Sequence, residues 1–285
     1  MTATSSLIDP LIAVFEAERV NYATGLMLDA GDFLDEQTYH RGRLARLVQA
    51  LVGHGTLAGL LVEKPGDDDP EWELRVRPGI AADRHGRLIE ITTSQCMRLV
   101  RWYDQQQDGA LFAAMHGADD DRQVVCDLFL AAHGCARGHT PAFADGTFDS
   151  IDATVPSRVE ERGVLSLVLR QEAAADLGSP VNHWPGAAAS REEACAAVLG
   201  SWPHDVLARA QDGLPTLDEH RKKQDPAAIL LARLHLPVEP PGAGELRPRL
   251  RMGSPVQVDN SLRPFIYLAG KWQGEALDPV DLNQP

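Results

Sequence analysis

The chain has 285 residues, of which 44% are hydrophobic and 24% are charged, and its formal net charge is −14. A chain of this length and composition can bury a core without disulfide or metal staples. So acidic a protein repels a polyanion, which argues against nucleic acid as a main partner. The low aromatic share of 6%, with 24 glycines and 19 prolines, indicates strands and turns rather than a helical bundle.

The first 19 residues read as an N-terminal arm. They contain an apolar patch that suits docking on a neighbour, formed by Leu11, Ile12, Val14 and Phe15. The opening residues lack a basic region followed by an apolar core, so we expect no signal peptide. No apolar stretch approaches the roughly 18 residues needed to span a membrane. We therefore expect cytoplasmic synthesis and assembly, without membrane insertion.

A long helix is predicted after an extended segment at residues 21–28. Asp29 is a suitable N-cap, because its carboxylate can accept a hydrogen bond from a free first-turn N–H. Steps of three and four then define one helical face, formed by Phe33, Gln37, His40, Leu44, Leu47, Val48 and Leu51. Gly53 and Gly55 are expected to end the helix. On this face, His40 is expected to be a packed core histidine.

Several acidic residues lie at the start of this helix. Asp32, Asp35 and Glu36 could suggest paired carboxylates for general acid–base catalysis. Acidic residues in the first turns are also favoured by the helix dipole. Their positions therefore need no catalytic explanation.

Short apolar or alternating runs bounded by turn residues predict the strands. They lie at 56–63, 72–77, 80–83, 87–91, 123–132, 158–171, 227–236 and 256–268. His85-Gly86 between the third and fourth of these predicts a hairpin. Residues 94–115 are predicted to be helical, and 133–157 to be a loop.

The predicted fold class is α+β, with short, mainly antiparallel strands, one long N-terminal helix and helical insertions. We expect a core domain over 20–172 and an alanine-rich helical insertion over 173–226, with helical pieces near 190–200 and 204–211. Residues 227–285 are expected to supply C-terminal strands that complete the core.

One group of residues has spacing compatible with a metal. Cys135 and His139 are separated by an interval found in zinc sites, with Cys126 and His133 nearby. However, Cys126 lies inside a predicted strand, where a small buried side chain is the usual role. The four cysteines, which include Cys96 and Cys195, form no CxxC pair and are typical of reduced cytosolic thiols. We expect no metal and no cofactor.

Sequence motifs for catalysis are missing. The chain contains no Gly-x-Ser-x-Gly elbow, no phosphate-binding Gly-x-x-x-x-Gly-Lys-Ser/Thr and no His-Glu-x-x-His. We therefore expect no catalytic residues and no enzymatic activity.

Residues 22–40 resemble the opening of accessory structural proteins of phage tails and extracellular contractile injection systems. The matching residues are Tyr22, Gly25, Asp32, Phe33, Gln37, Tyr39 and His40. The likeness continues into a Pro-Gly-x-Ala-x-Asp-x-x-Gly-Arg strand pair, and into two short islands. These later matches are Gly79, Asp83, Gly86, Arg158, Asn260 and Arg263. The chain departs from the pattern at His54-Gly55-Thr56, where relatives often have Trp-Gly-Val.

The resemblance implies an architectural role at a baseplate or as a fibre-attachment adaptor. The implied partners are other particle subunits (baseplate, sheath, tube or fibre proteins) and further copies of the chain in a homo-oligomer. Gly25–His40 also has a looser likeness to the opening of type VI secretion baseplate subunits. Two alternatives stay open: a cargo or effector with a metal-dependent activity at residues 126–139, and a glycan-binding module using Trp184 or Trp202.

Overall fold

The computed structural model describes residue 11 and residues 18–66, 68–141, 154–173, 176–180 and 213–266. Several predictions lie outside these residues. They concern Ile12, Val14, Phe15, Trp184, Cys195, Trp202 and the helical pieces near 190–200 and 204–211.

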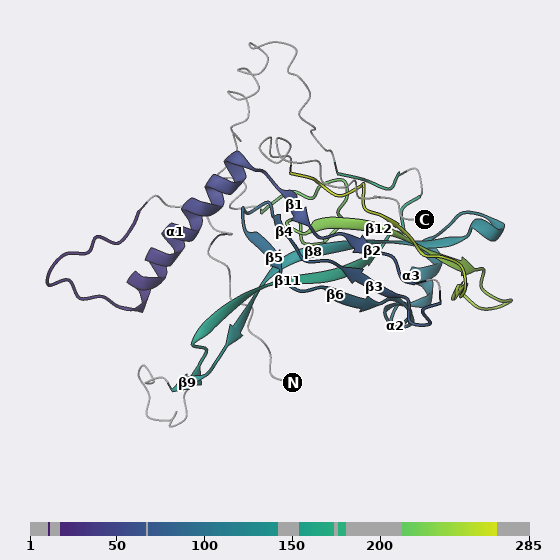
Figure 1. Cartoon of the computed structure of the whole chain (residues 1–285), viewed down its shortest axis with the longest axis horizontal. Helices are drawn as coiled ribbons and strands as arrows, with labels where there is room; N and C mark the ends of the chain where they lie inside the picture. Colours follow the sequence, from purple (N-terminus) through teal and green to yellow (C-terminus); the bar gives the residue numbers. More distant parts are fainter. Residues whose placement is uncertain are drawn as a thin grey trace, which may run out of the picture.

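A six-stranded antiparallel sheet forms the centre of the molecule (Figure 1). Its main path runs in the order β11-β8-β12-β13, while β14 also pairs with β12 and β7 with β8. The strands are β7 (Met115–His116), β8 (Gln123–Arg137), β11 (Arg158–Leu169), β12 (Ile229–Glu239), β13 (Arg249–Leu250) and β14 (Gln257–Asp259). β8 and β12 are the central strands, since each pairs with neighbours on both edges.

Two three-stranded sheets complete the body. One has the order β1-β4-β5 (Gly55–Gly59, Gly79–Ala82, Leu88–Ile91), and the other β2-β3-β6 (Val62–Glu63, Glu73–Val76, Gln95–Arg98). The predicted hairpin is confirmed as β4–β5. The single strand expected at 56–63 is wrong, since buried Leu60 has a φ of 57° and divides the run between two sheets.

The helices are α1 (Ala30–Leu51), α2 (Leu99–Asp104), α3 (Asp108–Ala113) and the 3-10 turn η2 (Asp119–Asp121). The long N-terminal helix is confirmed. The helix expected over 94–115 is partly wrong, because residues 95–98 pair with β3 as strand β6. Pairing to a neighbouring strand outweighs local helix propensity at this position.

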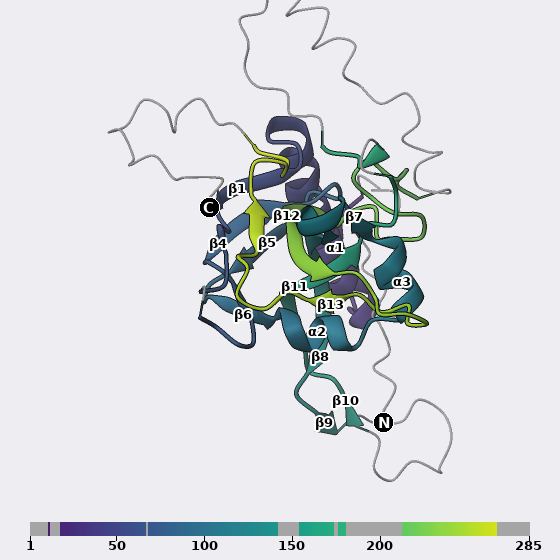
Figure 2. The ribbon, with the colours of Figure 1, turned by 90° about the vertical axis from the view of Figure 1, so that its right-hand side faces the viewer.

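The loop expected at 133–157 is also partly wrong. Strand β8 continues to Arg137 and pairs with β11 from Arg158 onward, and β9 (Thr140–Pro141) pairs with β10 (Thr154–Val155). This hairpin extends away from the body (Figures 1 and 2). Its outer part is largely exposed on both faces, so its sequence has no apolar alternation to reveal a strand.

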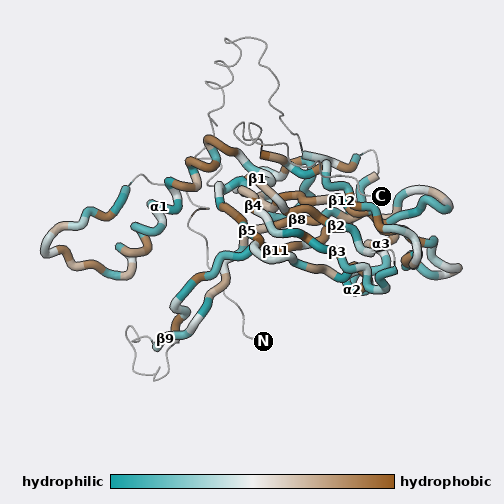
Figure 3. The backbone as a smooth tube through the Cα atoms, viewed as in Figure 1, coloured by the Kyte–Doolittle hydropathy of each residue, from teal (hydrophilic) through white to brown (hydrophobic). Residues whose placement is uncertain are grey.

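The principal core joins β8 and β12 to the β2-β3-β6 sheet and to α2 and α3. Apolar residues accordingly concentrate along the central strands in Figure 3. A smaller cluster of Phe129, Ala228 and Leu230 lies apart from the main cluster. The α+β fold class is confirmed. In the part of the chain that the structure describes, no helix is long and apolar enough to cross a membrane.

Candidate docking surface

Helix α1 begins at a capping box. Asp29 Oδ1 accepts hydrogen bonds from the N–H groups of Gly31 (2.7 Å) and Asp32 (3.2 Å), and Asp32 Oδ2 accepts one from the Asp29 N–H (2.9 Å). These bonds satisfy N–H groups that have no partner within the helix. Asp32, one of the residues that match the contractile-system pattern, therefore has a structural role at the helix start.

The helix packs on the body through a narrow face of Gly42, Ala45 and Val48. Val48 belongs to a small apolar cluster with Ala82 and Ile266. Gly86, with a φ of 78°, lies against the helix backbone, and a Cβ at this position would overlap the carbonyl oxygen of Ala45. The β4–β5 turn therefore supports α1 by direct backbone contact.

The apolar face predicted from the sequence points into solvent, except for Val48, which is buried. The exposed fractions are 54% for Phe33, 55% for Leu44, 53% for Leu47 and 73% for Leu51. At about 100° per residue, these four positions fall within an arc of roughly 60°, whereas the centre of the packed face lies roughly 120° away. We call Phe33, Gln37, His40, Leu44, Leu47 and Leu51 the exposed face of α1. The helix projects from the body in Figure 1.

The prediction that His40 is a packed core histidine is wrong. Its side chain is 66% exposed, and Nε2 lies 2.9 Å from Glu36 Oε1. Tyr39 meets the His40 ring edge-on, and the Arg43 guanidinium lies over the Tyr39 ring. The reason is the rotation of α1, which places small residues rather than the apolar face against the body.

The segment before α1 is also apolar and exposed. A turn at Gly25, with a φ of 88°, separates Tyr22 from Leu26 and Met27, and Met27 is 93% exposed. Exposed apolar residues gathered on a protruding element mark interaction surfaces more often than a scatter of single residues does. Of the four apolar residues of the predicted arm, the structure describes only Leu11, which is partly buried.

Asp83 closes the β4–β5 hairpin. Its fully buried carboxylate accepts hydrogen bonds from the backbone N–H groups of His85 and Arg87, both at 2.9 Å, and from Arg87 Nε at 2.6 Å. The Asp-x-x-Gly-Arg part of the sequence pattern therefore builds the turn on which α1 rests.

Three other matching residues gather where the chain passes from β1 to β2. Asn260 hydrogen-bonds Val62, Arg263 Nη1 donates to the carbonyl of Leu60 (2.7 Å), and Gly79 lies against the Leu60 backbone. Burial lowers the pKa of Arg263 to about 10. Arg158 lies apart from this group, exposed at the start of β11.

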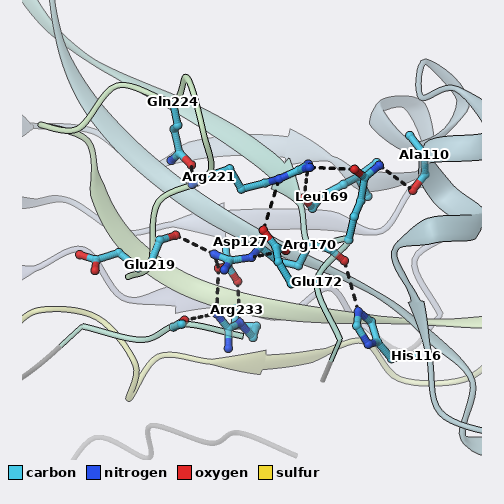
Figure 4. Close-up of polar contacts among 12 residues, drawn as sticks. Ala110, His116, Asp127, Leu169, Arg170, Glu172, Glu219, Arg221, Gln224 and Arg233 are labelled. Carbon is cyan, nitrogen blue, oxygen red and sulfur yellow. Dashed lines mark hydrogen bonds and ion pairs between the residues drawn. The ribbon is translucent and has the colours of Figure 1, made fainter. Parts of the chain in front are cut away.

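A buried cluster of charges was not predicted from the sequence (Figure 4). Asp127, fully buried on β8, accepts hydrogen bonds from Arg170 Nη1 (2.8 Å) and from Arg233 Nε and Nη2 (2.8 and 3.0 Å). Arg170 also donates to Glu172 and to the carbonyl of Glu219. The sequence signal for this cluster was the presence of Asp127 and Arg233 inside the apolar runs of β8 and β12.

This cluster stabilises the fold rather than forming an open site. Both oxygens of Asp127 are occupied by guanidinium groups, so the buried charge is paired and hydrogen-bonded. The bonds join β8, β12 and the end of β11 to the carbonyls of Gly178 and Glu219. The cluster therefore ties together segments that are distant in sequence.

The predicted Cys–His group is not brought together around one point. Cys126 and Cys135 lie nine residues apart on β8, which separates them by about 30 Å along an extended strand. Burial raises the pKa of the Cys126 thiol well above its usual value. Among the residues that the structure describes, no three His, Cys, Asp or Glu side chains are arranged to hold a metal ion.

The chain was compared with protein families, with curated proteins and with solved structures. No family model and no curated protein matches the sequence. The chain is similar to the crystal structure of TssK, with 14% identity and a TM-score of 0.28, over 55% of this chain and 35% of the TssK chain. The chain thus spans about a third of TssK.

Proposed function

We propose that this chain is a non-enzymatic structural subunit of a phage-tail-like contractile injection particle, at the baseplate or as a fibre-attachment adaptor. The exposed face of α1 is the observation that carries the proposal. The resemblance of residues 22–40 to accessory proteins of such particles gives the class of assembly.

The exposed face of α1 has the properties of a docking surface. Its helix is 22 residues long, is capped at its start and is fixed to the body by the contacts of Ala45 and Val48. Four large apolar side chains on one face remain more than half exposed. Covering them removes apolar area from water, and an amphipathic helix is a recurring recognition element.

The residues that match the family pattern support this reading in a second way. Asp32, Asp83 and Gly86 cap α1 and build the turn beneath it, while Asn260 and Arg263 hold the crossing from β1 to β2. The pattern thus describes a scaffold that presents a helix rather than a set of reacting groups. The buried charges around Asp127 are paired with one another, which favours a structural role for them too.

The experiment isolates particles by sedimentation from cells that carry the tagged chain, and images particles with and without it. We expect a fixed stoichiometry and a defined density at the baseplate. The variant Leu44→Glu with Leu47→Glu should fold normally but stay out of the particles, since charge on this face prevents its burial. Ala50→Glu is the matched control, because it adds a carboxylate to an exposed position away from the apolar arc.

The proposal fails if the wild-type chain stays separate from particles and if particles are unchanged in its absence. A stoichiometric metal content together with that result would instead favour a cargo protein with a metal-dependent activity.

A further inference from the structure

We infer that α1 pairs with α1 of a second copy of this chain, in a parallel and in-register coiled coil. This inference rests on the proposed function, because it names the partner of the exposed face defined there. The spacing, the chemistry of each layer and the charges beside the face support it independently of one another.

The spacing of the exposed face follows a heptad. Its six residues, at 33, 37, 40, 44, 47 and 51, are separated by alternating steps of four and three. This is the a and d repeat of helices that wrap around each other with a period of 3.5 residues. Gln37, Leu44 and Leu51 occupy a positions, and Phe33, His40 and Leu47 occupy d positions. A helix that packs only on its own domain has a broader apolar face, and that face is buried.

The layers of the face favour a parallel arrangement. In a parallel, in-register pair, each residue meets its equivalent, so that leucines meet leucines and Gln37 meets Gln37 of the second copy. An antiparallel pair centred on Gly42 would place Gln37 against Leu47 and His40 against Leu44. Polar groups would then be buried against apolar ones, without the hydrogen-bond partners that they need.

Charges beside the face favour the same orientation. Glu36 is at a g position, and Arg41 is at the e position five residues later. In parallel coiled coils, these positions of opposite helices lie side by side and form interhelical ion pairs. Glu36 of each helix would therefore form an ion pair with Arg41 of the second copy. An antiparallel pair would instead place Arg41 near Arg41 and Arg43 near Arg43.

Both members of the proposed pair already have contacts within one chain. Glu36 Oε1 lies 2.9 Å from His40 Nε2, while Glu36 Oε2 is buried and has no hydrogen-bond partner. Arg41 Nη2 donates to Glu161 at 2.9 Å, and the Arg41 side chain is partly exposed. A guanidinium has five N–H donors, so one Arg41 side chain can contact more than one acceptor. The body contacts α1 through Gly42, Ala45 and Val48, which leaves the a and d positions uncovered. The side view in Figure 1 shows α1 beyond the edge of the sheets.

The test uses the purified full-length chain and measures its mass in solution and its cross-linking. In a background with Cys96, Cys135 and Cys195 changed to serine, Leu44→Cys should form a disulfide-linked dimer under mild oxidation. A bond between two copies of residue 44 excludes the antiparallel pair centred on Gly42, in which residue 44 faces residue 40. Asp35→Cys, on the opposite side of α1, is the control that should not cross-link.

Two further variants test the chemistry of the interface. Leu44→Glu should return the mass to that of one chain. Glu36→Arg should weaken self-association, because it places a guanidinium beside Arg41 of the second copy. A chain that stays monomeric at high micromolar concentration and does not cross-link through residue 44 overturns the inference.

The outcomes separate this inference from the proposed function. A monomeric chain whose Leu44→Glu variant is lost from particles would show that another subunit covers the face, so the inference fails and the function stands. A chain that self-associates through residue 44 but never enters particles would retain the coiled coil and reject the particle assignment.

Discussion

Asn260 hydrogen-bonds both backbone polar groups of Val62, a residue 198 positions earlier in the chain. Its Nδ2 donates to the Val62 carbonyl and its Oδ1 accepts from the Val62 N–H, both at 3.0 Å. The side chains of Asn260 and Arg263 are both buried. Arg263 also donates to the carbonyls of Leu60 and Asn260. One amide side chain thus supplies the bonds that a neighbouring strand would give to the first residue of β2.

Replacing Asn260 should destabilise the protein. Asn260→Ala leaves the N–H and the carbonyl of Val62 buried without partners, and we expect a loss of about 2–3 kcal/mol in the free energy of unfolding. Urea denaturation measures the loss. Ser261→Ala, one position along and exposed, is the control and should change the value by less than about 0.5 kcal/mol. Equal effects of the two variants would contradict this role of Asn260.

Removing the buried carboxylate should be more costly. Asp127→Ala leaves Arg170 and Arg233 buried without their anion, which costs about 3–5 kcal/mol. The exposed pair of Arg137 and Glu160 offers the comparison, because breaking it with Glu160→Gln should cost about 1 kcal/mol or less. Chemical denaturation of both variants checks the contrast. A small loss for Asp127→Ala would mean that water reaches the cluster.

Gly86 and Gly25 form a matched pair for testing how α1 is held. Both have positive φ, but only at Gly86 would a Cβ overlap the Ala45 carbonyl, since nothing lies within 4 Å of the Cβ position at Gly25. Alanine at either position would have to adopt a left-handed backbone conformation, which lowers the free energy of unfolding by about 1–2 kcal/mol. Gly86→Ala should add the overlap and loosen α1. Faster hydrogen exchange along α1 in Gly86→Ala, but not in Gly25→Ala, is the expected result.

Stability should fall on mild acidification, partly because of His235. Burial, and then the nearby positive charge of Arg233, lower the pKa of His235 below its ordinary value of 6.5, although Asp259 and Asp127 act in the opposite direction. The unfolded chain then binds the proton more readily than the folded chain. The contribution of neutral His235 is therefore present above pH 6.5, and is lost as the pH falls toward the folded-state pKa.

The variant His235→Gln tests this assignment. It should reduce the slope of unfolding free energy against pH between about pH 5 and 7. Burial also lowers the pKa of His54, so some slope should remain. An identical slope for wild type and His235→Gln would refute the assignment.

The sequence by itself determined the elements whose signals are local. Asp29 fixed the start of α1, because a capping carboxylate acts within one turn, and Gly53 marked its end. The β4–β5 hairpin followed from its turn residues, and the alternation around Leu74 and Val76 followed from the two-residue repeat of a strand. These features depend on residues a few positions apart, which is why a single sequence reveals them.

Only the tertiary structure decided which surfaces are covered. The apolar face of α1 was evident in the sequence, but its exposure results from the rotation that places Ala45 on Gly86. Pairing with β3 likewise made a strand of residues 95–98, and Asn260 met Val62 only after the chain had folded back. Local periodicity defines a face, whereas its partner depends on contacts between residues that are distant in sequence. The site proposed for this protein is a face left uncovered once those contacts were made.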